Sequence, residues 1–303
     1  MVKINLPHNI ETWYLKEIGR FFKRNRTYSY KQASKIIKSS LGISLKKLLI
    51  ASPSELISIA EGIKVNQPVS FISDKRIFVD MYNKFRNSVS SKNYIEKVNV
   101  KVCPYCNRNY IFNFKKKKTK EATAQLDHFI DKGRYPYLAL SMYNLVPSCS
   151  VCNQRKSTKD VLNESIYNPY DDNIHNHIKF SSSEILSLED LKAKDLDFFS
   201  EERINIGIEA KTSDSRIDEH LETFNIDGLY NNHKDIVSEL YKKRVIYSDE
   251  YIEELLEQFG GIVFPNKDEL LRLITCGYVS DEDLHKRPLS KLIKDISQEL
   301  GLV

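Results

Sequence analysis

Two pairs of cysteines enclose a short segment that contains an aspartate and a histidine. The pairs are Cys103-Pro-Tyr-Cys106 and Cys149-Ser-Val-Cys152, and Leu126-Asp127-His128-Phe129 lies between them. Two Cys-x-x-Cys pairs separated by a few dozen residues are typical of a tetrahedral zinc site. Because four thiolates leave no open coordination position, we expect this zinc to be structural.

The segment between the cysteine pairs has the residue types that hydrolysis of a phosphodiester needs. His128 is the candidate general base, because its ordinary pKa of about 6.5 lies close to working pH. In an extended segment Asp127 points to the opposite side, where its carboxylate can bind a divalent cation. Asn153 follows the last cysteine and offers an amide oxygen to the same cation. Two oxygen ligands without an imidazole favour a hard ion, so we expect Mg²⁺, with Mn²⁺ as the alternative.

Together these residues resemble the HNH (ββα-metal) endonuclease family in its four-cysteine zinc subclass. Asp127-His128 matches the motif that carries the metal-binding carboxylate and the general base. Asn144 matches the central asparagine, and the resemblance implies that it braces the loop presenting the histidine. Asn153 occupies a position that is often histidine in the family, so this chain departs toward an H-N-N form. The match covers roughly residues 100–160 and implies a catalytic set of His128, Asn144, Asp127 and Asn153.

The residues around these motifs are also similar to a narrower group, the bacterial HNH proteins of the PtuB type. The similar segments are Cys-Pro-Tyr-Cys-Asn-Arg-Asn-Tyr, Leu-Asp-His-Phe, Tyr-Pro-Tyr-Leu-Ala-Leu-Ser and Asn-Leu-Val-Pro-Ser-Cys-x-x-Cys-Asn. This resemblance implies the nuclease of a Septu or retron-associated anti-phage system. It also implies a partner, an AAA/ABC-type ATPase similar to PtuA.

Charge is distributed unevenly along the 303 residues, although the net charge is only +5. Residues 1–160 contain 30 Lys and Arg against 11 Asp and Glu, whereas residues 161–303 contain 16 against 30. A basic half that includes the motif predicts a nucleic-acid partner, DNA before RNA. RNA stays open, because no base-reading element is visible. For the acidic half we expect a solvated surface, with docking to the ATPase as the alternative.

The candidate nucleic-acid contacts are basic residues close to the motif. Four of them form a run before Asp127: Lys115, Lys116, Lys117 and Lys118. The other two, Arg155 and Lys156, lie at the start of the helix expected after the last cysteine. Each phosphate contact would make binding weaker as salt rises. For the run, a solvated loop tip is the alternative.

The pattern of apolar residues predicts an α+β fold with mostly helical flanks around a zinc-stabilised ββα-metal core. We expect a basic helical region over residues 1–99, the nuclease motif over 100–165 and an acidic, mainly helical region over 166–303. In the first region Ile18, Phe21 and Phe22 recur at helical spacing, and Ser52-Pro53 is a helix start. In the last region the alternation of isoleucines over residues 204–208 predicts a strand, paired in a short hairpin with Leu196–Phe199.

The remaining features bound the class of protein. The N-terminus lacks the apolar run of a signal peptide, and no stretch approaches about 20 apolar residues, so we expect a cytoplasmic protein without membrane contact. Reduced thiols then favour metal binding over disulfides, and we expect Cys276, outside the pairs, to be buried. Two alternatives to a nuclease are a zinc-stabilised nucleic-acid-binding module and an interaction subunit with a vestigial site.

Overall fold

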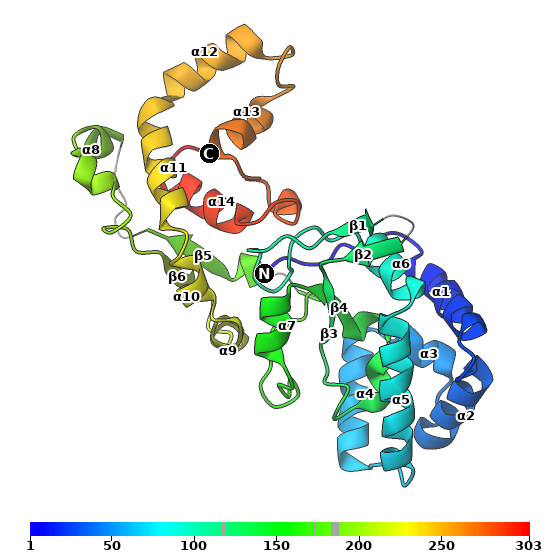
Figure 1. The fold of residues 1–303 in the computed structure, drawn as a ribbon. Helices are drawn as coiled ribbons and strands as arrows, with labels where there is room; N and C mark the ends of the chain where they lie inside the picture. Colours follow the sequence, from blue (N-terminus) through cyan, green and yellow to red (C-terminus); the bar gives the residue numbers. More distant parts are fainter. Residues whose placement is uncertain (117–118, 173, 183–187) are drawn as a thin grey trace. The chain divides into compact units, whose positions relative to one another are not determined.

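The chain forms two compact units in a computed structural model that describes residues 1–116, 119–172, 174–182 and 188–303 (Figure 1). The N-terminal unit comprises Lys3–Tyr105 and Ile111–Asp172. The C-terminal unit comprises Met1–Val2, Cys106–Tyr110 and Asn173–Val303. The division into three regions stays a prediction.

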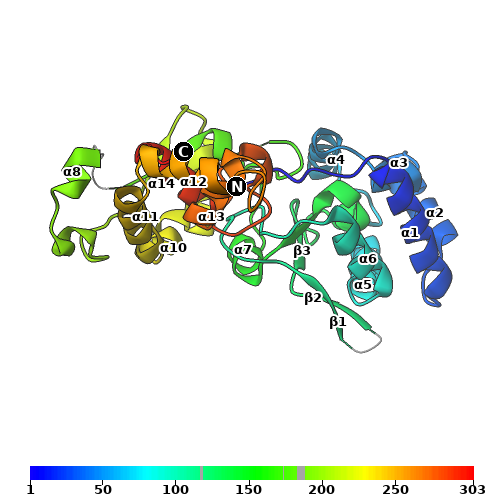
Figure 2. The same cartoon turned by 90° about the horizontal axis from the view of Figure 1, so that it is seen from above.

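Helices form most of the N-terminal unit: α1 (Ile10–Arg24), α2 (Tyr30–Leu41), α3 (Leu45–Leu49), α4 (Pro53–Val65), α5 (Phe71–Arg86), α6 (Val89–Val98) and α7 (Ser150–Lys156). The same unit has two short antiparallel ribbons, β1 (Asn113–Lys116) with β2 (Thr119–Ala122) and β3 (Gln125–His128) with β4 (Leu145–Ser148). The 3-10 turns η1 (Pro136–Leu140) and η2 (Met142–Asn144) connect β3 to β4. The first ribbon lies beside α6 (Figure 2).

The helix signals in the first hundred residues are confirmed. Ser52 caps α4, its side chain accepting from the Glu55 amide while Glu55 accepts from the Ser52 amide, with Pro53 in the first turn. The predicted apolar positions Phe21 and Phe22 are buried in α1. Local capping and periodicity therefore determine these helices.

Buried tyrosines of the helices fix the position of the second ribbon. The hydroxyl of Tyr82, on α5, donates to the carbonyl of Leu126 in β3 at 2.9 Å. The hydroxyl of Tyr94, on α6, donates to the carbonyl of Leu145 in β4 at 3.0 Å. Buried polar groups are costly without partners, so these pairs specify one placement of the ribbon on the helices.

The C-terminal unit is mainly helical: α8 (Leu188–Lys192), α9 (Arg216–Phe224), α10 (Ile226–Tyr230), α11 (Lys234–Ile246), α12 (Asp249–Phe259), α13 (Lys267–Thr275) and α14 (Ser290–Glu299). Its ribbon pairs β5 (Ile178–Ser181) with β6 (Gly207–Ala210) in antiparallel register. Short 3-10 turns are η3 (Ile174–Asn176), η4 (Leu196–Phe199) and η5 (Asp281–Asp283). The mixed, mainly helical content agrees with the α+β prediction.

Two predictions in this unit were wrong. Leu196–Phe199 is the 3-10 turn η4 and not a strand, because Asp195 caps the turn by accepting from the Phe198 amide; β6 pairs instead with the more distant β5. Cys276 is exposed rather than buried, because it ends α13 in a left-handed conformation with φ of 59°. The alternation over residues 204–208 therefore overlaps β6 only at residues 207 and 208, and it did not identify the partner strand.

Candidate active site and metal centre

Strands β3 and β4 and helix α7 form a small ββα unit that contains most of the predicted site. The register pairs Asp127 with Val146 and His128 with Leu145. Helix α7 begins directly after β4 and packs against β3 (Figure 1). Because side chains alternate along a strand, Asp127 and His128 project from opposite faces of β3, as predicted.

The four paired cysteines converge on one point. Their sulfur atoms all lie within 4.8 Å of one another, and all four side chains are buried and free of disulfides. A tetrahedral zinc with bonds of about 2.3 Å needs sulfurs about 3.8 Å apart, which this cluster approaches. The predicted ligand set of Cys103, Cys106, Cys149 and Cys152 can therefore bind a metal such as zinc.

Backbone amides support the thiolate form of two of these cysteines. The Arg108 amide donates to the sulfur of Cys106 and the Cys152 amide donates to the sulfur of Cys149, both at 3.4 Å. Such donors stabilise negative charge on sulfur and orient metal ligands. Asn107, just after Cys106, has a φ of 50°, a left-handed turn that asparagine tolerates better than most residues.

His128 is buried and held in a defined orientation. Its Nε2 lies 3.0 Å from the carbonyl oxygen of Ala139, and its ring packs edge-on against Tyr82 at 4.2 Å between centroids. Since a carbonyl can only accept, Nε2 carries the hydrogen and Nδ1 keeps the lone pair. Burial, with the nearby ammonium of Lys132, lowers the pKa of His128 to about 3. The imidazole is therefore neutral near pH 7, with Nδ1 as its proton acceptor. Its pKa lies well below the ordinary value of about 6.5 on which the prediction of a general base rested, because burial disfavours the imidazolium, so in this geometry His128 is a weak base.

Asn144 braces the chain that follows His128. Its amide oxygen accepts from the Ile130 amide at 2.7 Å, and its amide nitrogen donates to the carbonyls of Ile130 and Leu138, each at 3.1 Å. Asn144 is fully buried, and its own carbonyl accepts from the Phe129 amide. These bonds fix the loop that follows His128.

Asp127 lies on the α7 side of β3 and is surrounded by donors. The hydroxyl of Tyr105 donates to its carboxylate at 2.7 Å, and the ammonium of Lys156 lies 3.3 Å from the same oxygen. Lys156 also donates to the carbonyl of His128 at 2.6 Å. Burial, followed by the charge of Asp127, raises the pKa of the Tyr105 hydroxyl well above 10, so it stays a donor. Asp127 thus has a cation and a hydroxyl as partners within the protein.

Asn153 lies on the same side of β3 as Asp127. Its amide nitrogen donates to the side-chain oxygen of Gln125 at 2.5 Å. Gln125 and Asp127 are two residues apart on β3 and share a face, while Asn153 and Lys156 are three apart on α7 and share a face. The structure therefore brings the two predicted oxygen ligands to one strand–helix interface.

The predicted nucleic-acid contacts divide into different groups. Lys115 and Arg155 are exposed, as a phosphate contact requires. Lys156 is buried, with 1% of its surface exposed, because its ammonium group faces Asp127 rather than solvent. Lys117 and Lys118 lie outside the described residues, and the side chain of Lys116 is not described.

Two residues of the site were not singled out from the sequence, and a third was given a different role. Tyr105 lies inside the first cysteine pair, Tyr82 comes from α5, and Lys156 was assigned to the substrate rather than to Asp127. Tyr105 has a sequence signal, because a residue between two zinc ligands is held close to the motif. Tyr82 has none, since 46 positions separate it from His128 and only the packing of α5 brings it there.

Comparison with known proteins gives one informative match. Septu protein PtuB of Bacillus thuringiensis is 29% identical to this chain over 175 residues. The matched residues are 54% of this chain and 65% of the relative, just under two thirds of its length. This similarity supports a Septu-like relationship. No family model and no solved structure matches the chain.

The described helices carry no segment that is both long and apolar enough to span a membrane.

Proposed function

We propose that this protein is a metal-dependent endonuclease of the HNH type that hydrolyses phosphodiester bonds of DNA. The observation that carries the proposal is the ββα unit, in which a braced, neutral His128 and a carboxylate lie on opposite faces of β3 beside a four-cysteine cluster. A protein that only binds nucleic acid needs neither a fixed proton-accepting histidine nor a carboxylate on the opposite face of the same strand. The similarity to PtuB supports a role in anti-phage defence, which we propose involves a PtuA-like ATPase partner.

In this mechanism His128 removes a proton from water through Nδ1, while Ala139 holds the ring by accepting from Nε2. The water oxygen attacks phosphorus, the P–O bond to the leaving oxygen breaks, and that oxygen takes a proton from a solvent water. The His128 imidazolium then returns its proton to solvent. Asn144 keeps the loop beside His128 in place, so the base needs no rearrangement.

The residues present fit a hard divalent cation, Mg²⁺ or Mn²⁺, in ligand type. The carboxylate of Asp127 and the amide oxygen of Asn153 would hold it, and the cation would neutralise charge on the scissile phosphate. For this the Lys156 ammonium must leave the carboxylate, since both cations need the same oxygens. The zinc held by the four cysteines is structural in this proposal.

A second candidate is a zinc-stabilised nucleic-acid-binding module without catalysis. The observation that favours it is the contact between Lys156 and Asp127, which already balances the carboxylate charge inside the protein. In that case the Asp127–Lys156 pair is only structural.

Cleavage of supercoiled plasmid separates the two candidates. The purified chain is incubated with Mg²⁺, with Mn²⁺ or with EDTA, beside the His128→Ala and Cys276→Ser proteins. We expect metal-dependent nicking that His128→Ala abolishes with zinc content unchanged, and that Cys276→Ser retains. Nicking by His128→Ala at the parent rate would remove His128 as the base. Binding of plasmid without nicking under any metal would favour the second candidate.

A further inference from the structure

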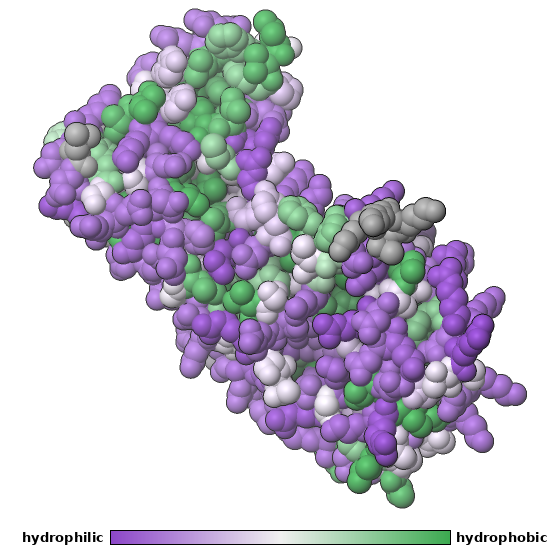
Figure 3. Space-filling view, in the orientation of Figure 1, coloured by the Kyte–Doolittle hydropathy of each residue, from purple (hydrophilic) through white to green (hydrophobic). Residues whose placement is uncertain are grey.

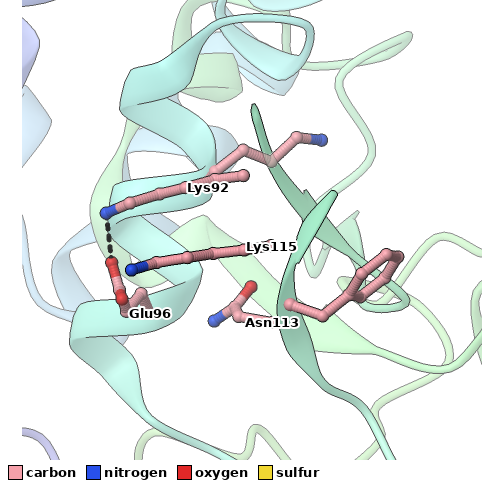
Figure 4. Close-up of a pocket in the computed structure, with 6 residues that line it drawn as sticks. Lys92, Glu96, Asn113 and Lys115 are labelled. Carbon is pink, nitrogen blue, oxygen red and sulfur yellow. Dashed lines mark hydrogen bonds and ion pairs between the residues drawn. The ribbon is translucent and has the colours of Figure 1, made fainter. Parts of the chain in front are cut away.

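The ribbon of β1 and β2 separates polar from aromatic side chains. Its register places Lys115 directly opposite Lys120, and Asn113 projects from the same face. Figure 4 shows Asn113 and Lys115 directed toward α6, across a pocket of about 180 Å³. Lys92 and Glu96 of α6 line the other side of this pocket.

The residues that line this pocket carry more positive than negative charge. Lys120 donates to Glu96 at 2.5 Å and to Asn93 at 2.9 Å, so this lysine is paired. Neither Lys92 nor Lys115 forms an ion pair with any described residue. Two lysines directly opposite across a ribbon repel each other, which lowers its stability. Three ammonium groups around one carboxylate indicate an anionic ligand.

The other face of the ribbon exposes two phenylalanines. Phe112 is 45% exposed and Phe114 is 47% exposed. They share a face because they are two residues apart and the ladder continues past β1, where the Thr123 amide donates to the Phe112 carbonyl at 2.8 Å. Consecutive side chains over residues 112–115 thus alternate between aromatic and polar. One short segment of β1 and the residue before it therefore presents rings on one face and a lysine on the other.

We propose that the β1–β2 ribbon binds an unpaired segment of nucleic acid, with phosphates at Lys92 and Lys115 and bases stacked on Phe112 and Phe114. Lysines attract any nucleic acid, but exposed rings stack only on bases that are not already stacked inside a duplex. The nuclease would then act beside single-stranded or locally opened substrate. This inference rests on the proposed function, because it names the form of the substrate.

The test is equilibrium binding of the full chain without added divalent cation. Fluorescence anisotropy compares a labelled 20-nucleotide single strand with the corresponding duplex. We expect Phe112→Ala and Phe114→Ala each to weaken single-strand binding roughly 5-fold or more, with duplex binding unchanged. Phe114→Trp should restore single-strand binding, because tryptophan also stacks.

The lysines give the second arm of the test. Lys92→Ala with Lys115→Ala should weaken binding of both forms and reduce the salt slope for single strand by about 1.4. Lys31→Ala with Lys35→Ala, two exposed lysines of α2, is the matched control and should not change binding. Equal weakening of single strand and duplex by the phenylalanine variants, or no weakening, would overturn the proposal. Binding without cleavage in Mg²⁺ would instead count against the nuclease alone.

Discussion

Asp127 is the residue at which the proposed chemistry and the stability of the protein meet. Its carboxylate is 3% exposed and contacts a buried ammonium and a buried hydroxyl. A buried ion pair adds little net stability, but removing one partner leaves an uncompensated charge. The Lys156 contact to the His128 carbonyl extends this arrangement to the candidate base. The same group of residues therefore orients the carboxylate and fastens β3 to α7.

Replacing Lys156 by methionine tests this reading of Asp127. We expect Lys156→Met to lower the free energy of unfolding by about 3–5 kcal/mol, because Asp127 stays buried without its cation. Urea unfolding in zinc-containing buffer measures the change. Arg155→Met, the same substitution at the exposed neighbour, should change it by less than about 0.5 kcal/mol. Equal effects of the two substitutions would show that the contact with Asp127 contributes nothing.

His128 gives a prediction about pH. Its pKa is lowered to about 3 in the folded chain, against about 6.5 when unfolded, so the unfolded state binds more protons between these values. The contribution of the neutral His128 to the free energy of unfolding is then present above about pH 6.5 and is lost as the pH falls toward 3. From pH 7 to pH 5 the parent should lose about 2 kcal/mol more than His128→Gln, which cannot titrate. Urea midpoints at both pH values measure this, and parallel losses would contradict the burial of a neutral imidazole.

At the scale of elements, α7 supplies much of the site. Its N-cap is Cys149, its first turn carries Cys152, and Asn153 and Lys156 follow on the face toward β3. A seven-residue helix is too short to be stable by itself, so its packing on β3 and the cysteine cluster must hold it. Metal binding and the placement of Asn153 are therefore expected to be linked.

Cys149→Ser tests whether metal binding at the cysteine cluster contributes to folding, without disturbing the cap of α7. Serine is a good N-cap, so the substitution removes a metal ligand while leaving a side chain that can cap α7. We expect lower zinc content by elemental analysis and a lower melting temperature, because structural zinc contributes folding energy. Cys276→Ser at the exposed cysteine should leave both unchanged. Full zinc content and an unchanged melting temperature in Cys149→Ser would remove the structural-zinc prediction.

Local sequence signals predicted individual helices and strands better than they predicted which residues and strands contact one another. The Ser52 cap, the apolar face of α1 and the spacing of the cysteines depend on neighbours in sequence, and each agrees with the structure. The role of Lys156 was missed because charge near a motif suggests substrate, whereas only tertiary packing turns this side chain inward. The partner of β6 was missed for the same reason, since its closest apolar stretch in sequence is not its partner in space.

At the scale of the whole molecule, the basic and acidic halves of the sequence suggest different partners. The C-terminal unit contains most of the acidic half and also exposes apolar side chains at the end of α12 and just after it. Phe259, Ile262 and Val263 are 40%, 81% and 64% exposed, and Figure 3 shows hydrophobic surface gathered over this end of α12. Exposed apolar side chains beside charged ones are typical of a protein interface. We propose this end of α12 as a docking surface for the proposed ATPase partner, in place of the solvated surface that the sequence led us to expect for the acidic half.

Aspartate substitutions at this surface test the docking prediction. When the tagged chain is co-expressed with a PtuA-like ATPase, Ile262→Asp and Val263→Asp should reduce recovery of the ATPase at least tenfold, because a charge buried at an interface without a partner costs several kcal/mol. Val69→Asp, at a fully exposed valine of the N-terminal unit, is the matched control and should retain the ATPase. Because all three side chains face solvent, unchanged melting temperatures would show that folding is intact. Loss of the ATPase only with Val69→Asp would move the interface to the basic unit and leave the apolar end of α12 without this role.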